Sequence, residues 1–144
     1  MPTPYLSNLG PDGRVPRAEP TSGTAVRFQT VIPVLSVHDV DEACAWYKDV
    51  LGFDIGWSWG SPPTIASVFR DGMEFNLGLR GESGPPTYSV VYVQMMGVTA
   101  YHEAVRGRGA RISSPLRHQP YGMIDFEITD PSGNRITFGE TTTS

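Results

Sequence analysis

The chain has 144 residues, of which 39% are hydrophobic and 18% charged, and its formal net charge is −4. This is the length and composition of one soluble globular domain, and the 11 scattered Lys and Arg residues argue against a nucleic-acid-binding surface. A single cysteine excludes an intramolecular disulfide framework and no apolar run could span a membrane, so we expect a cytoplasmic protein without membrane or nucleic-acid partners.

The N-terminal segment, residues 1–24, is rich in proline and glycine and lacks a periodic apolar pattern, which predicts a flexible arm. The following segment, AVRFQTVIPVLSV (25–37), is rich in β-branched residues and predicts the first strand. Because Pro33 has no backbone N–H to donate, we expect a free edge or a bulge at this position.

Residues 39–52 predict a helix with clear start and stop signals. Asp39 is a typical N-cap residue, and Glu42 follows three residues later, as in a capping box. Gly52 suits the left-handed conformation in which many helices end. An apolar stripe at helical spacing is formed by Val40, Ala43, Tyr47 and Val50.

Three strands are predicted next, over residues 53–59, 64–70 and 73–79. The Asp71-Gly72 pair indicates a two-residue hairpin, because both turn positions favour positive φ. This register places one mixed set of side chains on one face: Ile65, Ser67, Phe69, Glu74 and Asn76. The opposite face is apolar and carries Ala66, Val68, Phe75 and Leu77. We expect the apolar face to contact the helix and the mixed face to line a cavity.

The same order of elements then returns. Its predicted parts are a strand (88–95), a helix (97–109), a strand starting at 110–112, a loop (113–122), a strand (123–129), a turn (130–134) and a strand (135–140). A shift of about 58 residues superposes Asp39 on Gly97, which indicates two βαβββ modules in tandem. We predict an α+β fold with module one at about 25–80, module two at about 87–140 and a tail at 141–144. The modules are expected to form a curved antiparallel sheet with a concave cleft and with helices on the outer face.

Two stretches, VIPVLSVHDVDEACAWYKDVLGF and GMIDFEITDPSGNRITFGE, resemble the vicinal-oxygen-chelate superfamily of glyoxalases, dioxygenases and bleomycin-resistance proteins. The resemblance implies four metal-ligand positions in the metalloenzymes of this superfamily. Carried over by motif spacing, they fall at Ile32, Glu74, Val90 (or its neighbour Ser89) and Thr137. Only Glu74 offers a metal-binding side chain, whereas such a site needs at least three donors. We therefore predict no metal and no other cofactor.

The histidines, serines and cysteine of the chain also give little indication of a catalytic site. None of His38, His102 and His118 falls on an inward strand position or shows ligand spacing with another histidine, so we expect surface or supporting roles for them. The chain contains no G-x-S-x-G elbow, and Cys44 lies mid-helix beside two alanines, as a packed residue would. No catalytic residue is predicted.

The metal-free pattern resembles bleomycin-resistance-type proteins most. That resemblance implies a homodimer with clefts at the subunit interface, which sequesters an aromatic antibiotic, such as a bleomycin-like or enediyne compound, without chemistry. Two alternatives stay open. One is a glyoxalase- or dioxygenase-like metalloenzyme, and the other is a metal-independent isomerase or cyclase with Glu74 as general base.

A cleft for an aromatic ligand needs apolar walls, rings and a few polar anchors. The predicted ligand-binding residues are Trp57, Trp59, Phe69, Glu74, Asn76, Tyr92 and Tyr121. The two tryptophans are the ambiguous members, since an unbroken strand would turn both toward the helix side together with Phe53. A bulge at Gly56 would switch the face, and a strand that overruns the helix would leave Trp59 at the cleft rim.

Overall fold

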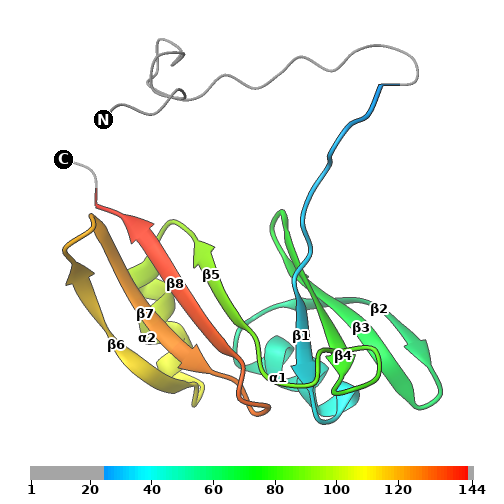
Figure 1. Cartoon of the computed structure of the whole chain (residues 1–144). Coiled ribbons are helices and arrows are strands. Elements are labelled where there is room, and N and C mark those ends of the chain that lie inside the picture. Colours follow the sequence, from blue (N-terminus) through cyan, green and yellow to red (C-terminus); the bar gives the residue numbers. More distant parts are fainter. Residues whose placement is uncertain (1–24, 143–144) are drawn as a thin grey trace. The chain divides into compact units, whose positions relative to one another are not determined.

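The computed structural model describes residues 25–142, so the predicted arm at 1–24 and the last two residues of the predicted tail lie outside the described residues. From Ile32 onward the described residues form one compact unit (Figure 1). Residues 25–33 form no helix or strand, and the first strand, β1, is short, at Val34–Val37. The prediction of a strand over residues 25–37 is therefore wrong for its first nine residues. High β propensity does not make a strand unless a neighbour accepts its hydrogen bonds.

Module one contains β1, the helix α1 (Val40–Asp49) and the strands β2 (Asp54–Gly60), β3 (Pro63–Arg70) and β4 (Met73–Leu79). Its strands form one sheet in the order β1-β4-β3-β2, in which β1 runs parallel to β4 and the other pairs are antiparallel. The N-cap prediction is confirmed, because the Asp39 side chain accepts a hydrogen bond from the Glu42 N–H at 2.9 Å. Gly52 has a φ of 75° and ends the turn after α1, as expected.

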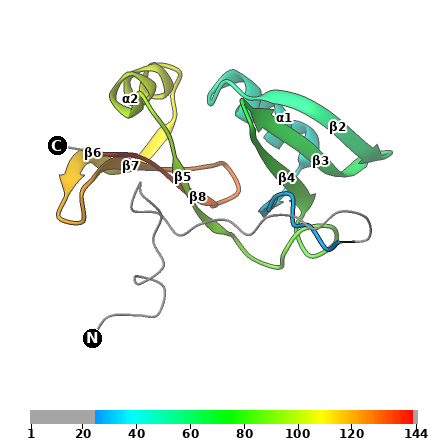
Figure 2. The same cartoon turned by 90° about the horizontal axis from the view of Figure 1, so that it is seen from above.

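Module two repeats this plan with β5 (Val90–Gln94), α2 (Val98–Gly107), β6 (Arg111–Gln119), β7 (Met123–Thr129) and β8 (Arg135–Thr141). Its sheet has the order β5-β8-β7-β6, again with one parallel pair. Two four-stranded mixed sheets thus replace the predicted single antiparallel sheet, while the α+β class and the two tandem modules are confirmed. Each helix lies on one face of its own sheet (Figure 2). Neither helix in the described part of the chain is long and apolar enough to cross a membrane.

The segment predicted as a loop at 113–122 is mostly strand β6, which is a second correction. This segment contains Pro115, and β6 is an edge strand with two register shifts against β7. An edge position tolerates proline because one side of the strand needs no hydrogen-bond donors. The internal repeat is confirmed: α1 and α2 begin at Val40 and Val98 and each spans 10 residues.

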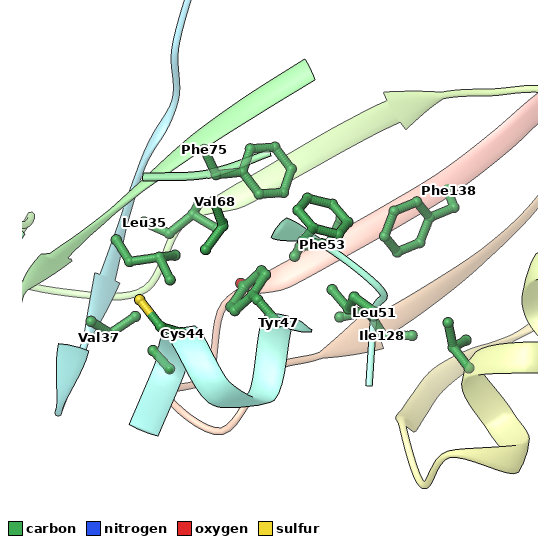
Figure 3. Packing of buried hydrophobic residues seen from close by; sticks show 14 of the residues in the cluster. Leu35, Val37, Cys44, Tyr47, Leu51, Phe53, Val68, Phe75, Ile128 and Phe138 are labelled. Atoms are coloured by element: carbon green, nitrogen blue, oxygen red, sulfur yellow. The ribbon is translucent and has the colours of Figure 1, made fainter. Parts of the chain in front are cut away.

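Buried side chains between each helix and its sheet form the hydrophobic core. In module one, Tyr47 of α1 packs edge-to-face on Phe53 and Phe75 (Figure 3). In module two, Tyr101 of α2 contacts Phe138 in the same geometry. Aromatic residues of this size dominate the burial energy of such a core.

The turn DPSGN (130–134) fastens module two to module one through buried polar groups. Asp130 accepts hydrogen bonds from the Tyr47 hydroxyl at 2.7 Å and from the Asn134 amide at 2.8 Å. The same amide donates to the Ser36 carbonyl at 2.7 Å, and its oxygen accepts from the Ser89 N–H at 2.7 Å. Because Asp130 and Asn134 are buried, these bonds satisfy groups that would otherwise be costly to desolvate. The turn motif therefore holds the two modules together.

Candidate functional site

Each sheet has one face covered by its helix, and the opposite face is here called the open face. In module one the register Arg70–Met73 puts Phe69 opposite Glu74 and Ser67 opposite Asn76. The alternating set, which includes Ala66, Val68, Phe75 and Leu77, is buried under α1. The predicted division of this hairpin into a mixed face and an apolar face is confirmed. Phe69, Glu74 and Asn76 lie together on the open face.

Strand β2 settles the direction of the tryptophans. Its register against β3 shifts by one residue between Ile55 and Ser58, which is a β-bulge at Gly56–Trp57. After the bulge Trp59 pairs with Ile65, a member of the open-face set. Trp57 and Trp59 are 47% and 70% exposed. The indoles therefore belong to the open face and its rim and not to the core.

Glycine at position 56 is needed for close approach. A Cβ atom there would lie 2.9 Å from the Ser67 hydroxyl and 3.5 Å from the Phe69 ring. Gly56 thus lets β2 lie close to Ser67 and Phe69 without a side chain that would fill the space next to them.

A cavity of about 440 Å³ lies on this open face of module one. It is lined by Gly56, Trp57, Ser67, Phe69, Asp71, Gly72, Met73 and Glu74. The Glu74 carboxylate accepts a hydrogen bond from the Ser67 hydroxyl at 2.5 Å. The side-chain oxygen of Asn76 is buried and has no hydrogen-bond partner among the described residues. Two rings and a carboxylate line this cavity, which suits a polar aromatic ligand, whereas Asn76 pairs with Ser67 in the sheet and does not line the cavity.

The open face of module two carries a second aromatic group. Tyr92 lies on β5 and Tyr121 in the turn between β6 and β7, and they are 47% and 63% exposed. Both hydroxyls donate to the same oxygen of Asp125, at 3.0 Å from Tyr92 and 2.8 Å from Tyr121. The other oxygen of Asp125 accepts from the Gln119 amide at 2.8 Å. The two predicted tyrosines therefore meet at one carboxylate.

Asp125 is the site residue that sequence reasoning missed. Its neighbours Phe126 and Ile128 alternate into the core, so strand periodicity already placed Asp125 on the open face. The residue is only 4% exposed. Burial raises the pKa of this carboxyl, but the hydrogen bonds from Gln119, Tyr121 and Tyr92 and the nearby Arg117 outweigh burial and leave its pKa below the ordinary value.

The pKa values of the Tyr92 and Tyr121 hydroxyls are raised, whereas that of Asp125 is lowered. Desolvation of its hydroxyl end, followed by the hydrogen bond to Asp125, raises the pKa of Tyr92 to about 12. The hydrogen bond to Asp125 also raises the pKa of Tyr121. Both hydroxyls therefore stay protonated at neutral pH and act as hydrogen-bond donors, not as bases.

Space for the Tyr92 ring comes from Gly139 on β8. A Cβ atom at this position would clash with the Tyr92 hydroxyl and would lie 2.7 Å from the ring carbon that carries it. Gly139 pairs with Asp125 in the register of β7 and β8. Only glycine at this position leaves room for the phenol to lie across β8 and reach Asp125.

The implied metal-ligand positions do not fit a metal. Ile32 and Val90 carry hydrocarbon side chains and Thr137 a hydroxyl, which leaves Glu74 as the one strong donor. Over residues 25–142 no group of three or more His, Cys, Asp or Glu side chains is arranged to hold a metal ion. The donor set at these four positions is therefore too poor for the metal chemistry that the superfamily's metalloenzymes carry out.

A further cavity of about 470 Å³ lies between the modules. Its walls include Arg70, Met73, Met95 and Tyr101, and none of the predicted ligand-binding residues lines it. Arg70 lies over the Tyr101 ring at 5.2 Å and donates to the Leu51 carbonyl at 3.0 Å, while the Tyr101 hydroxyl donates to the same carbonyl at 2.7 Å. These contacts hold the modules together at the end of α1.

Comparisons with known proteins agree with this architecture. TioX from Micromonospora sp. ML1 is 22% identical, with a TM-score of 0.71 over 79% of this chain and 99% of TioX. A glyoxalase-related enzyme from Clostridium phytofermentans is 25% identical, with a TM-score of 0.64 over 84% of this chain and 99% of that one. Lactoylglutathione lyase from Agrobacterium tumefaciens is 17% identical, with a TM-score of 0.65 over 83% of this chain and 96% of the lyase. At these identities the shared property is the fold.

No match was found among curated proteins. A family model described as glyoxalase superfamily protein matches residues 17–144, which is nearly the whole chain. The chain therefore belongs to the glyoxalase superfamily.

Proposed function

We propose that this chain is a metal-independent small-molecule binding protein that sequesters an aromatic antibiotic, such as a bleomycin-like or enediyne compound, on its open faces. The observation that carries the proposal is the cavity in module one, where Trp57 and Phe69 stand beside the carboxylate of Glu74. Aromatic walls supply stacking area, and a carboxylate with a hydroxyl partner supplies an anchor for a cationic or hydrogen-bonding group.

The size of the cavity supports a ligand of this class. Small-molecule sites are generally about 300–1,000 Å³, and the module-one cavity has about 440 Å³. An aromatic compound too large for this cavity alone would also need a second aromatic surface to contact. Tyr92 and Tyr121 on module two offer one, with their hydroxyls already held by Asp125.

We further propose that the protein acts as a homodimer in which the open face of one chain meets that of a second copy. Large apolar side chains stand exposed on both open faces, among them Trp57, Trp59, Val90 and Tyr92. A dimer that covers these side chains would remove their apolar surface from water. A dimer would enclose the ligand between rings of the two modules.

The test is calorimetric titration of the purified protein with metal-free bleomycin, an enediyne and flavin mononucleotide, together with metal analysis of the same preparation. We expect saturable binding of at least one compound, no stoichiometric metal and no product. Trp57→Phe should weaken binding about tenfold through the loss of stacking area, whereas Trp46→Phe on α1 is the matched control and should bind normally.

Three results would contradict the proposal. Stoichiometric zinc, nickel, manganese or iron would indicate a metalloenzyme. Turnover that is abolished by Glu74→Gln while binding persists would indicate an isomerase or cyclase with Glu74 as base. No heat of binding with any of the three compounds would remove antibiotic sequestration as the function.

A further inference from the structure

Asp125 is a buried carboxylate next to two tyrosines whose side chains are about half exposed. It is covered from three directions by the Tyr92 phenol from β5, the Tyr121 phenol from the turn after β6 and the Gln119 amide from the end of β6. No ion pair joins it to a cation among residues 25–142 that the structure describes, although Arg117 lies opposite it on β6. Its charge is therefore balanced mainly by these three hydrogen bonds.

The hydrogen bonds to Asp125 restrict the rotamers of Tyr92 and Tyr121. A tyrosine that is about half exposed ordinarily samples several rotamers, but both hydroxyls here converge on one oxygen. The Tyr92 ring also lies directly against Gly139, because its hydroxyl occupies the position where a Cβ atom would be. Hydrogen bonds to an ionised acceptor are stronger than neutral ones, and here the same carboxylate oxygen accepts from both hydroxyls.

We infer that Asp125 is a positioning residue for the ligand site, which fixes the Tyr92 and Tyr121 rings in one arrangement on the open face of module two. The inference rests on the proposed function for the ligand itself, whereas the fixed rings are a property of the free protein. Rings that are already ordered cost less entropy when a ligand stacks on them. Asp125 needs no contact with the ligand for this role.

The first test uses the free protein and Asp125→Asn, which keeps the size of the side chain and loses the charge. NMR of ring-labelled tyrosine should follow Tyr92 and Tyr121 through an alkaline titration. In the wild type the pKa of Tyr92 is raised to about 12 from an ordinary 10.0. In Asp125→Asn it should fall toward the ordinary value, and both rings should show signals of faster rotamer exchange.

Glu127→Gln is the matched control, because Glu127 lies on the same face of β7 two residues later and, among residues 25–142, its carboxylate bonds only to the Ser113 hydroxyl. It should leave both tyrosines as in the wild type. Should Asp125→Asn fail to fold, Tyr92→Phe keeps the ring and deletes its tether, and the phenylalanine ring of that variant should then become mobile. Two results would overturn the inference: unchanged phenol pKa values and ring motion in the folded Asp125→Asn protein, or a phenylalanine ring in Tyr92→Phe that is as ordered as the native tyrosine.

The second test measures affinity for metal-free bleomycin in a double-mutant cycle. Asp125→Asn and Tyr92→Phe should each raise Kd about tenfold, the range expected when a side chain must be immobilised on binding. The double variant should be no weaker than Asp125→Asn alone, because Asp125→Asn already removes the tether of Tyr92 together with that of Tyr121. Wild-type affinity in the Asp125→Asn protein would show that ring order does not serve binding and would overturn the inference. Absence of bleomycin binding by the wild type would count against the proposed function instead, since the NMR test still decides the positioning.

Discussion

Gly139→Ala adds one methyl group at the point where Tyr92 crosses β8. The new Cβ would lie 2.7 Å from the hydroxyl-bearing carbon of the Tyr92 ring and 3.0 Å from the adjacent ring carbon, closer than carbon atoms can pack. Backbone strain plays no part, because Gly139 does not have the positive φ that favours glycine. The ring must therefore leave, and its hydrogen bond to Asp125 must break.

The energetic cost follows from what each partner does next. Tyr92 is 47% exposed and can turn to solvent, and Asp125 keeps the hydrogen bonds from Tyr121 and Gln119. A hydrogen bond to a charged group contributes about 1.5–3 kcal/mol, and partial replacement by water should bring the net loss to about 1 kcal/mol. The free energy of unfolding should thus fall only slightly, while the pKa of Tyr92 should drop from about 12 toward the ordinary value.

Urea denaturation and a tyrosine titration of the same sample separate these effects. Gly107→Ala on α2 is the control, since a Cβ there meets nothing within 4 Å and should leave stability equal or slightly higher. A Gly139→Ala protein that retains the wild-type Tyr92 pKa would refute the reasoning. A loss far above about 2 kcal/mol would mean that the methyl group disturbs the sheet and not only the ring.

Three further predictions concern the rest of the structure. Asn134→Ala should lower the unfolding free energy by about 2–4 kcal/mol in urea denaturation. The reason is that the variant loses a buried amide with three side-chain hydrogen bonds and leaves its partners unsatisfied. A loss below about 1 kcal/mol would contradict the role of the turn. Burial first, and then the charge of Asp130, raises the pKa of Tyr47 well above 10.0. The contribution of protonated Tyr47 to the unfolding free energy should therefore be fully present below pH 10 and be lost as the pH rises further. In alkaline denaturation Tyr47→Phe should reduce the dependence of the unfolding free energy on pH, and an unchanged dependence would contradict this prediction. Gly56→Ala should place a methyl group 2.9 Å from the buried Ser67 hydroxyl, so Ser67 must shift and the melting temperature should fall. The same shift should weaken bleomycin binding, whereas unaltered affinity would show that this part of the cavity is not used.

Local signals predicted most of module one correctly. The Asp71-Gly72 turn fixed the register of β3 and β4, and with it the faces of Phe69 and Glu74, because a two-residue hairpin allows one pairing only. The cap at Asp39 and the stop at Gly52 gave the ends of α1 to within a few residues. These features depend on residues near one another in the chain, which is why they can be predicted from it.

Features that depend on distant partners were harder to predict. The segment 25–33 has strand-forming residues but no strand beside it in the described chain, and β6 is a strand despite Pro115 because its outer edge is free. The bulge at Gly56 was one of three alternatives, beside an unbroken strand and a strand that overruns the helix, and only the register against β3 showed the bulge. Asp125 gains its importance from residues on β5, on β6 and in a turn, a convergence that no local pattern reveals.

The central claim is that ligand binds the open faces, and the three tryptophans of the chain allow a direct test. Trp57 and Trp59 belong to the open face of module one and its rim, whereas Trp46 lies on α1, on the helix side, against Tyr47. Indole N–H signals should therefore be followed by NMR during titration with metal-free bleomycin. We predict saturable shifts for Trp57 and Trp59 and an unmoved signal for Trp46. Shifts confined to Trp46, or no shift of any indole at saturating ligand, would contradict the account.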